Sequence, residues 1–73
     1  MKMKYVRIGE YNSIVIFPEI LQHNEFKHLN PKSAGFCYIK EKEIVCFGES
    51  ISLRLTSHEK DSYYATKQYF THI

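Results

Sequence analysis

Length constrains this chain more than any motif in it. A chain of 73 residues buries only about 60% of the surface that it exposes when unfolded, so one thin core must supply most of its stability. This length allows a single domain over residues 1–73 and leaves no room for a second one. A homodimer is a further source of buried surface and remains an open alternative.

The composition is that of a folded domain, with 44% hydrophobic and 25% charged residues. Its longest uninterrupted apolar stretch is Ile14–Phe17, far shorter than the roughly 20 residues that cross a bilayer. The segment Met1–Glu10 lacks the apolar core of a signal peptide. We therefore expect a cytoplasmic protein without a membrane partner.

Turn residues divide the N-terminal half into segments. In Met1–Ile8, Lys2 and Lys4 alternate with Met and Tyr side chains, which is typical of a half-buried strand. Gly9–Ser13 supplies turn residues, and the apolar run Ile14–Phe17 predicts a buried strand. Pro18 ends that strand and favours the first turn of a helix that extends to about Leu29, before Asn30-Pro31.

The C-terminal half predicts a hairpin, a strand and a helix. The β-branched and aromatic runs Gly35–Lys40 and Glu43–Gly48 flank a charged turn and indicate the hairpin. From Ile51 to Thr56, apolar and polar residues alternate strictly, as in a strand with one buried face. Thr56 and Glu59 have the spacing of a capping box, which predicts that the last helix begins there.

The expected element order is therefore ββαβββα. Short connections favour an antiparallel sheet of four or five strands with both helices on one face, an α+β fold. The last helix should bury a face that contains Ala65, Tyr69, Phe70, Tyr63 and Ile73, whereas Tyr64 points away from that face.

The two cysteines lie in the predicted hairpin. If its loop is symmetric about Glu41 and Lys42, Cys37 lies directly opposite Cys46. A disulfide would require a closer approach than this pairing provides, so we expect two buried, reduced thiols. No CxxC spacing is present, and the four histidines are not near the cysteines in sequence. We predict no metal and no cofactor.

Residues for hydrolytic catalysis are poorly placed in the sequence. Ser33 or Ser50 as nucleophile and His23 as base would need a strained Gly-x-Ser-x-Gly turn, and neither serine has one. Asp61 is the only aspartate that could orient a histidine. We predict no catalytic residues and a protein that is not an enzyme.

Aromatic residues are the least ordinary part of the composition, with six Tyr and five Phe. Such rings either fill a thin core or provide contact area for a partner, because they supply large surfaces at low entropic cost. We predict that the partner is contacted by polar or amphipathic residues outside the core, namely Tyr5, Arg7, Glu49, Arg54 and Tyr64.

Nucleic acid is the less favoured partner. The formal net charge is only +2, and phosphate contacts dominate the affinity of proteins for nucleic acids. Lys2, Lys4, Tyr5 and Arg7 nevertheless interleave basic and aromatic side chains in the first strand, as some nucleic-acid-binding surfaces do. A small nucleic-acid-associated regulator is therefore the alternative function.

Residues 14–61 resemble short uncharacterised proteins of bacteriophages and prophages. The resemblance lies in four groups of residues: Phe17-Pro18-Glu19, His23, Ser33-Ala34-Gly35-Phe36, and Cys46-Phe47-Gly48-Glu49-Ser50 with Ser52-Leu53. It implies a phage-borne protein that binds and occludes a host protein or complex, as an inhibitor in host takeover or counter-defence. The expected function is thus a non-enzymatic protein-interaction module.

Overall fold

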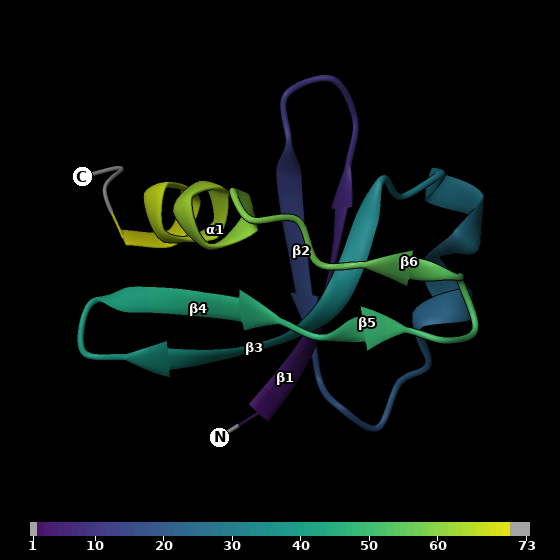
Figure 1. Ribbon diagram of the computed structural model, residues 1–73, viewed down its shortest axis with the longest axis horizontal. Helices are drawn as coiled ribbons and strands as arrows, with labels where there is room; N and C mark the ends of the chain where they lie inside the picture. Colours follow the sequence, from purple (N-terminus) through teal and green to yellow (C-terminus); the bar gives the residue numbers. More distant parts are fainter. Residues whose placement is uncertain (1, 71–73) are drawn as a thin grey trace.

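The computed structural model describes residues 2–70 of the chain (Figure 1). Six strands, one 3₁₀ helix and one α-helix occur within this range. Their order is β1 (Lys2–Ile8), β2 (Ser13–Phe17), η1 (His23–Leu29), β3 (Ser33–Lys40), β4 (Glu43–Phe47), β5 (Glu49–Ser50), β6 (Leu55–Thr56) and α1 (Asp61–Phe70). Met1 and Ile73, which the sequence assigned to a strand and to a helix face, lie outside the described residues.

The four longer strands form one antiparallel sheet in the order β2-β1-β3-β4. The short strands β5 and β6 pair with each other in a second, two-stranded sheet. The hairpin β3–β4 turns at Glu41 and Lys42, and Cys37 is the partner of Cys46. The predicted α+β class, the antiparallel sheet and the pairing of the two cysteines are all confirmed.

The main sheet has a core on each of its faces. The first cluster contains Tyr5, Ile14, Cys37, Ile44 and Ala65 of α1. The second contains Val6, Phe17 and Ala34, against which Phe26 of η1 packs. Because Tyr5 and Val6 are neighbours in β1, their side chains point to opposite faces. The two helices therefore cover opposite faces, and this differs from the expected arrangement on one face.

Helix α1 protects the backbone of both outer strands. Thr66 Oγ1 accepts from Ile44 N in β4 at 2.9 Å, and Ser62 Oγ accepts from Cys46 N at 2.8 Å. On β2, Gln68 Oε1 accepts from Ile14 N at 2.9 Å, while Gln68 Nε2 donates to Ile14 O at 2.8 Å. Edge strands with unpaired backbone N–H and C=O groups can pair with other chains. The side chains of α1 bond to several of these groups in β2 and β4 and so protect them from such pairing.

The first helix is shorter than predicted and has a different geometry. It is a 3₁₀ helix that begins at His23, and Pro18 instead opens a turn in which Leu21 N donates to Pro18 O. Gln22 and Glu25 form a capping box at the start of η1. The apolar residues of this segment do not repeat every 3.6 positions, so an α-helix would have no continuous stripe to bury.

The strand predicted from Ile51 to Thr56 is mostly a turn. Residues 51–54 form turns, and the strand β6 contains only Leu55 and Thr56. The buried Ser50 Oγ accepts a hydrogen bond from Leu53 N at 3.3 Å, which offers the backbone an alternative to strand pairing. Arg54 adopts a left-handed φ of 57°, and Ile51 is 83% exposed.

The capping box predicted at Thr56 and Glu59 is wrong, because Thr56 belongs to β6 and α1 begins at Asp61. The carboxylate that reaches back to the chain before the helix is that of Asp61, whose Oδ2 accepts from His58 N at 2.9 Å. Asp61 N in turn donates to His58 O at 2.9 Å. A buried aspartate thus replaces the exposed Glu59 as the acidic cap.

Candidate functional site

Asp61 is the centre of a buried polar network between α1 and the sheet. Its side chain is fully buried, at 0% exposure. Tyr5 OH donates to Asp61 Oδ2 at 2.5 Å, and Ser33 Oγ donates to the same oxygen at 2.7 Å. With the bond from His58 N, three donors converge on one carboxylate oxygen. Such convergence stabilises a buried charge that would otherwise be costly.

Arg7 supplies the opposite charge of this network. Its Nε lies 3.0 Å from Asp61 Oδ1 and donates a hydrogen bond to Ser33 Oγ at 2.9 Å. Asp61 Oδ1 therefore meets the guanidinium charge without an aligned hydrogen bond of its own. Burial, together with the hydrogen bond to Asp61 and its negative charge, raises the pKa of Tyr5 far above its usual value. Tyr5 stays a neutral hydrogen-bond donor.

Arg7 also connects the network to the surface. Its Nη1 donates to Asn12 Oδ1 at 2.7 Å, and its guanidinium carbon lies 5.9 Å from the centre of the Tyr64 ring. Asn12 lies in the turn between β1 and β2 and has a left-handed φ of 56°, a conformation that Asn tolerates better than most residues. The partly buried Arg7 guanidinium thus contacts one side chain of the turn and one of α1.

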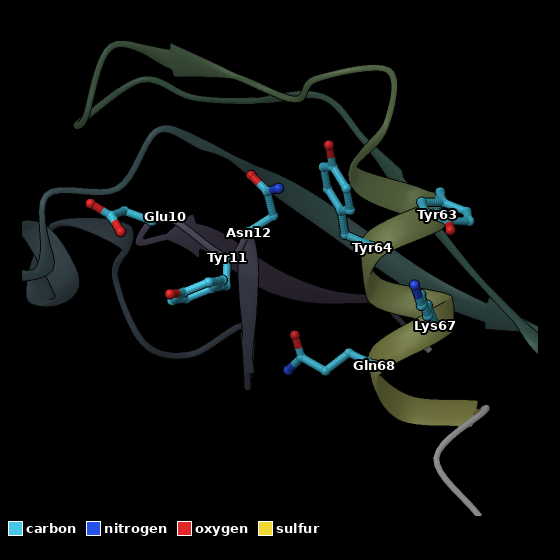
Figure 2. A pocket seen from close by; sticks show the side chains of 7 residues that line it. All are labelled: Glu10, Tyr11, Asn12, Tyr63, Tyr64, Lys67 and Gln68. Atoms are coloured by element: carbon cyan, nitrogen blue, oxygen red, sulfur yellow. The ribbon is translucent and has the colours of Figure 1, made fainter.

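Between this turn and α1 lies a cleft of about 550 Å³. We call it the tyrosine cleft. Its lining residues are Glu10, Tyr11, Asn12, Tyr63, Tyr64, Lys67 and Gln68. Figure 2 shows Tyr64 and Gln68 projecting from α1 toward the side of the turn that carries Tyr11 and Asn12.

The walls of the tyrosine cleft differ in exposure. Tyr11 is 89% exposed and Tyr63 is 60% exposed, whereas Tyr64 is half-buried and packs against the core. The Tyr63 and Tyr64 rings meet edge to face with centres 5.8 Å apart, and Lys67 Nζ lies 5.8 Å from the centre of the Tyr63 ring. The cleft therefore combines exposed rings with a wall held by the core.

The structure brings together three of the five predicted contact residues. Tyr5, Arg7 and Tyr64 all belong to the Asp61 network or its border. The placement of Tyr5 outside the core is wrong, because Tyr5 is fully buried. Alternation along β1 separates its two faces, but it does not show that α1 covers the face that carries Tyr5.

The helix face predicted for α1 is also corrected. Tyr63, assigned to the buried face, is mostly exposed, and Tyr64, assigned to the exposed side, packs against the core. Ala65 is buried as predicted. The difference arises because Ser62, Thr66 and Gln68 of α1 point toward the strand edges and bond to their backbone. The face of α1 that is buried is therefore not its most apolar face.

Glu49 and Arg54 lie at other surfaces. Both are exposed, Glu49 in β5 and Arg54 in the turn before β6. Each lines a different hollow of the surface, and neither hollow includes residues of the tyrosine cleft. The five predicted contact residues therefore do not form one continuous site.

Sequence reasoning missed Tyr11, Tyr63 and Gln68. The signal for Tyr11 was the turn Gly9–Ser13, since a ring at a turn has little core to enter. Tyr63 and Gln68 had no comparable signal, because their roles depend on which strand edge α1 meets.

The residues considered for catalysis do not form a Ser-His-Asp arrangement. Ser33 donates directly to Asp61, with no histidine between them. His23 instead bonds Gly35 O through Nε2 at 2.8 Å, and burial lowers the pKa of His23. Among residues 2–70, no group of three or more His, Cys, Asp or Glu side chains is placed to hold a metal ion.

Comparisons of the chain with protein families, with curated proteins and with solved structures found no match. Within the described residues, no helix is long and apolar enough to span a bilayer.

Proposed function

We propose that this chain is a small non-enzymatic binding protein that docks on a larger protein through the tyrosine cleft. One observation carries the proposal. Tyr11 of the β1–β2 turn and Tyr63 of α1 are both exposed at the cleft, while Tyr64, which also lines it, packs against the core. Tyrosine is enriched in protein interfaces, because its ring buries a large area while its hydroxyl still bonds to a partner.

The cleft offers a partner both apolar area and hydrogen bonds. Three tyrosine rings supply the apolar contact, and the Asn12 and Gln68 amides also line the cleft. Glu10 and Lys67 place one negative and one positive charge on the lining. This mixture fits a protein segment with polar and aromatic side chains better than a uniformly charged ligand.

Preorganisation supports the same proposal. Arg7 ties Asn12 to Asp61, and Gln68 is fixed by two hydrogen bonds to Ile14. Because these side chains are ordered before the partner arrives, binding costs less conformational entropy. The resemblance to short phage proteins suggests the class of partner, namely a host protein or complex that the bound chain would inhibit by occlusion.

Site-specific photo-crosslinking tests the proposal. A photoreactive phenylalanine is placed at Tyr11 in one sample and at Glu41, in the distant β3–β4 turn, in the other. We expect a host protein to cross-link strongly from position 11 and weakly from position 41. The host protein identified by the cross-link is then purified without the cross-link and titrated with the unmodified chain.

In that titration, Tyr11→Ala and Tyr63→Ala should each weaken the affinity at least about tenfold, as loss of a central aromatic contact does. Glu41→Ala should leave the affinity unchanged. Equal cross-linking from both positions, or full affinity of the Tyr11→Ala/Tyr63→Ala double variant, would contradict the proposal. A stable homodimer that Tyr11→Ala dissociates would place a second copy in the cleft, and it would also overturn the proposal.

A further inference from the structure

A second exposed surface lies on the sheet face that η1 covers only in part. Three aromatic side chains of the hairpin β3–β4 share this face with three lysines. In the register, Lys4 pairs with Phe36 and Phe36 with Phe47, while Lys2 pairs with Tyr38. Residues two apart in a strand share a face. We call this surface the aromatic face, and it comprises Phe36, Tyr38, Phe47, Lys2, Lys4 and Lys40.

The rings of the aromatic face are accessible and yet fixed in place. Tyr38 is 37% exposed and Phe47 is 39% exposed. The Phe47 ring lies 6.0 Å from Phe36 and 5.8 Å from Tyr38, measured between centres. Phe36 in turn meets the buried His23 edge to face at 5.7 Å. The exposed rings thus belong to an array that continues into the core.

One lysine lies over a ring of the aromatic face, and the other two occupy neighbouring positions on the same face of the sheet. Lys2 Nζ is 4.7 Å from the centre of the Phe36 ring and 3.2 Å from Glu19 Oε2. Lys4 Nζ donates to Leu21 O at 2.8 Å, and Lys40 lies opposite Glu43. An ion pair as exposed as that of Lys2 with Glu19 contributes little, so an anionic ligand can replace the glutamate.

Basic side chains continue beyond the aromatic face. A hollow of about 590 Å³ beside Phe36 and Phe47 includes Glu49 and Ser52 in its lining. Ser52 also lines a second hollow of about 540 Å³, to which Lys27 and Arg54 contribute. The two hollows therefore adjoin. The aromatic face and these two hollows together contain five of the ten Lys and Arg residues of the chain, namely Lys2, Lys4, Lys27, Lys40 and Arg54. The acidic residues beside them are Glu19, Glu43 and Glu49.

We propose that the aromatic face binds single-stranded nucleic acid. Bases would stack on Phe47 and Tyr38, and the neighbouring lysines would contact the phosphates. Lysine is depleted in protein interfaces, so three lysines on the same sheet face as these rings favour a polyanion over a second protein. This binding would be independent of the tyrosine cleft, because the two surfaces share no lining residue.

Fluorescence anisotropy with a labelled oligothymidylate of about 20 nucleotides tests the proposal, because sites of this type cover about 4–16 nucleotides. We expect saturable binding that weakens as salt rises, with a log–log slope of about −2 if three phosphates are neutralised. A duplex of the same length should bind more weakly, because its bases are not free to stack. Absence of saturable binding at low salt would overturn the proposal.

Two substitutions at Phe47 separate stacking from simple apolar contact. Phe47→Leu should weaken binding at least about fivefold, whereas Phe47→Tyr should retain it, because only the tyrosine keeps a ring for stacking. Circular dichroism confirms that both variants are folded. Tyr11→Ala, in the tyrosine cleft, is the matched control and should bind as the unmodified chain does.

Three results would contradict the proposal: full affinity of Phe47→Leu, duplex binding as tight as single-strand binding, or an affinity that salt does not change. Competition between the oligonucleotide and the host protein would contradict the proposed independence of the aromatic face and the tyrosine cleft. Because Tyr11→Ala affects only the cleft, failure here is distinguishable from failure of the proposed protein interaction.

Discussion

Asp61 has no exposed surface, and one of its carboxylate oxygens accepts three hydrogen bonds. The other oxygen faces Arg7 Nε. A buried ion pair contributes little net stability when it is compared with an apolar pair, but removal of one partner leaves an uncompensated charge. Loss of either Asp61 or Arg7 alone should therefore destabilise the folded protein.

Asp61→Asn should lower the free energy of unfolding by about 3–5 kcal/mol. The amide oxygen can still accept from Tyr5 and Ser33, but the amide NH₂ would face Arg7 Nε, so two donors would oppose each other. Urea unfolding measures the change. Glu59→Gln removes an exposed carboxylate two residues earlier and should change stability by less than about 0.5 kcal/mol. Equal stability of the two variants would show that the network is not required.

The cysteine pair gives the protein a predicted sensitivity to alkali. Burial raises the pKa of Cys37 to about 11 and that of Cys46 to about 12. Thiols in an unfolded chain ionise near about 8.5, so the unfolded state loses these protons at lower pH. The stabilisation is complete below that value and is lost as the pH rises toward the folded values.

The free energy of unfolding of the reduced protein should therefore fall between about pH 8 and about pH 10.5. Tyr5, whose pKa is also raised, contributes with the same sign at the upper end of this range. Cys46→Ala isolates the contribution of its thiol and should make the decline less steep. A decline of equal slope in Cys46→Ala would exclude a contribution from that thiol.

At the scale of elements, α1 acts as a cover for two strand edges as well as a core helix. Its polar side chains bond to the backbone of Ile14 in β2 and of Ile44 and Cys46 in β4. Tyr69 OH also donates to Ile14 O at 2.8 Å. These contacts explain how a helix with several polar residues on its inner side packs stably on the sheet.

Gln68→Glu tests this role of α1. The carboxylate can still accept from Ile14 N, but its second oxygen replaces the amide donor and faces Ile14 O, which keeps only the hydrogen bond from Tyr69 OH. We expect a loss of about 1–3 kcal/mol in the free energy of unfolding and increased self-association at the β2 edge. Light scattering measures the association. Lys60→Gln, at an exposed position, is the control, and if it behaved like Gln68→Glu the edge explanation would fail.

In the molecule as a whole, the sequence predicts the features that depend on residues close to one another along the chain. The hairpin β3–β4 and the pairing of Cys37 with Cys46 followed from turn position and alternation alone. The same reasoning located β1 and β2, whose polar and apolar residues are divided by clear turn signals. These features are set by residues fewer than about 20 positions apart.

What the sequence did not predict depends on contacts between distant segments. Tyr5 and Asp61 are 56 positions apart, and their hydrogen bond joins the buried face of β1 to the first residue of α1. The tyrosine cleft likewise requires that α1 lie beside the β1–β2 turn. The aromatic face was foreseen only in part, through Lys2 and Lys4, because its rings come from the two strands that lie beyond β1.

A protein partner in the tyrosine cleft should change the amide chemical shifts of the residues that line it. The ¹⁵N-labelled chain is titrated with the purified host protein that the cross-linking experiment identifies. We expect the shift changes to concentrate in residues 9–13 and 63–68, while β3 and β4 change little. Shift changes concentrated in β3 and β4, with the β1–β2 turn and α1 unaffected, would show that the partner does not bind in the cleft.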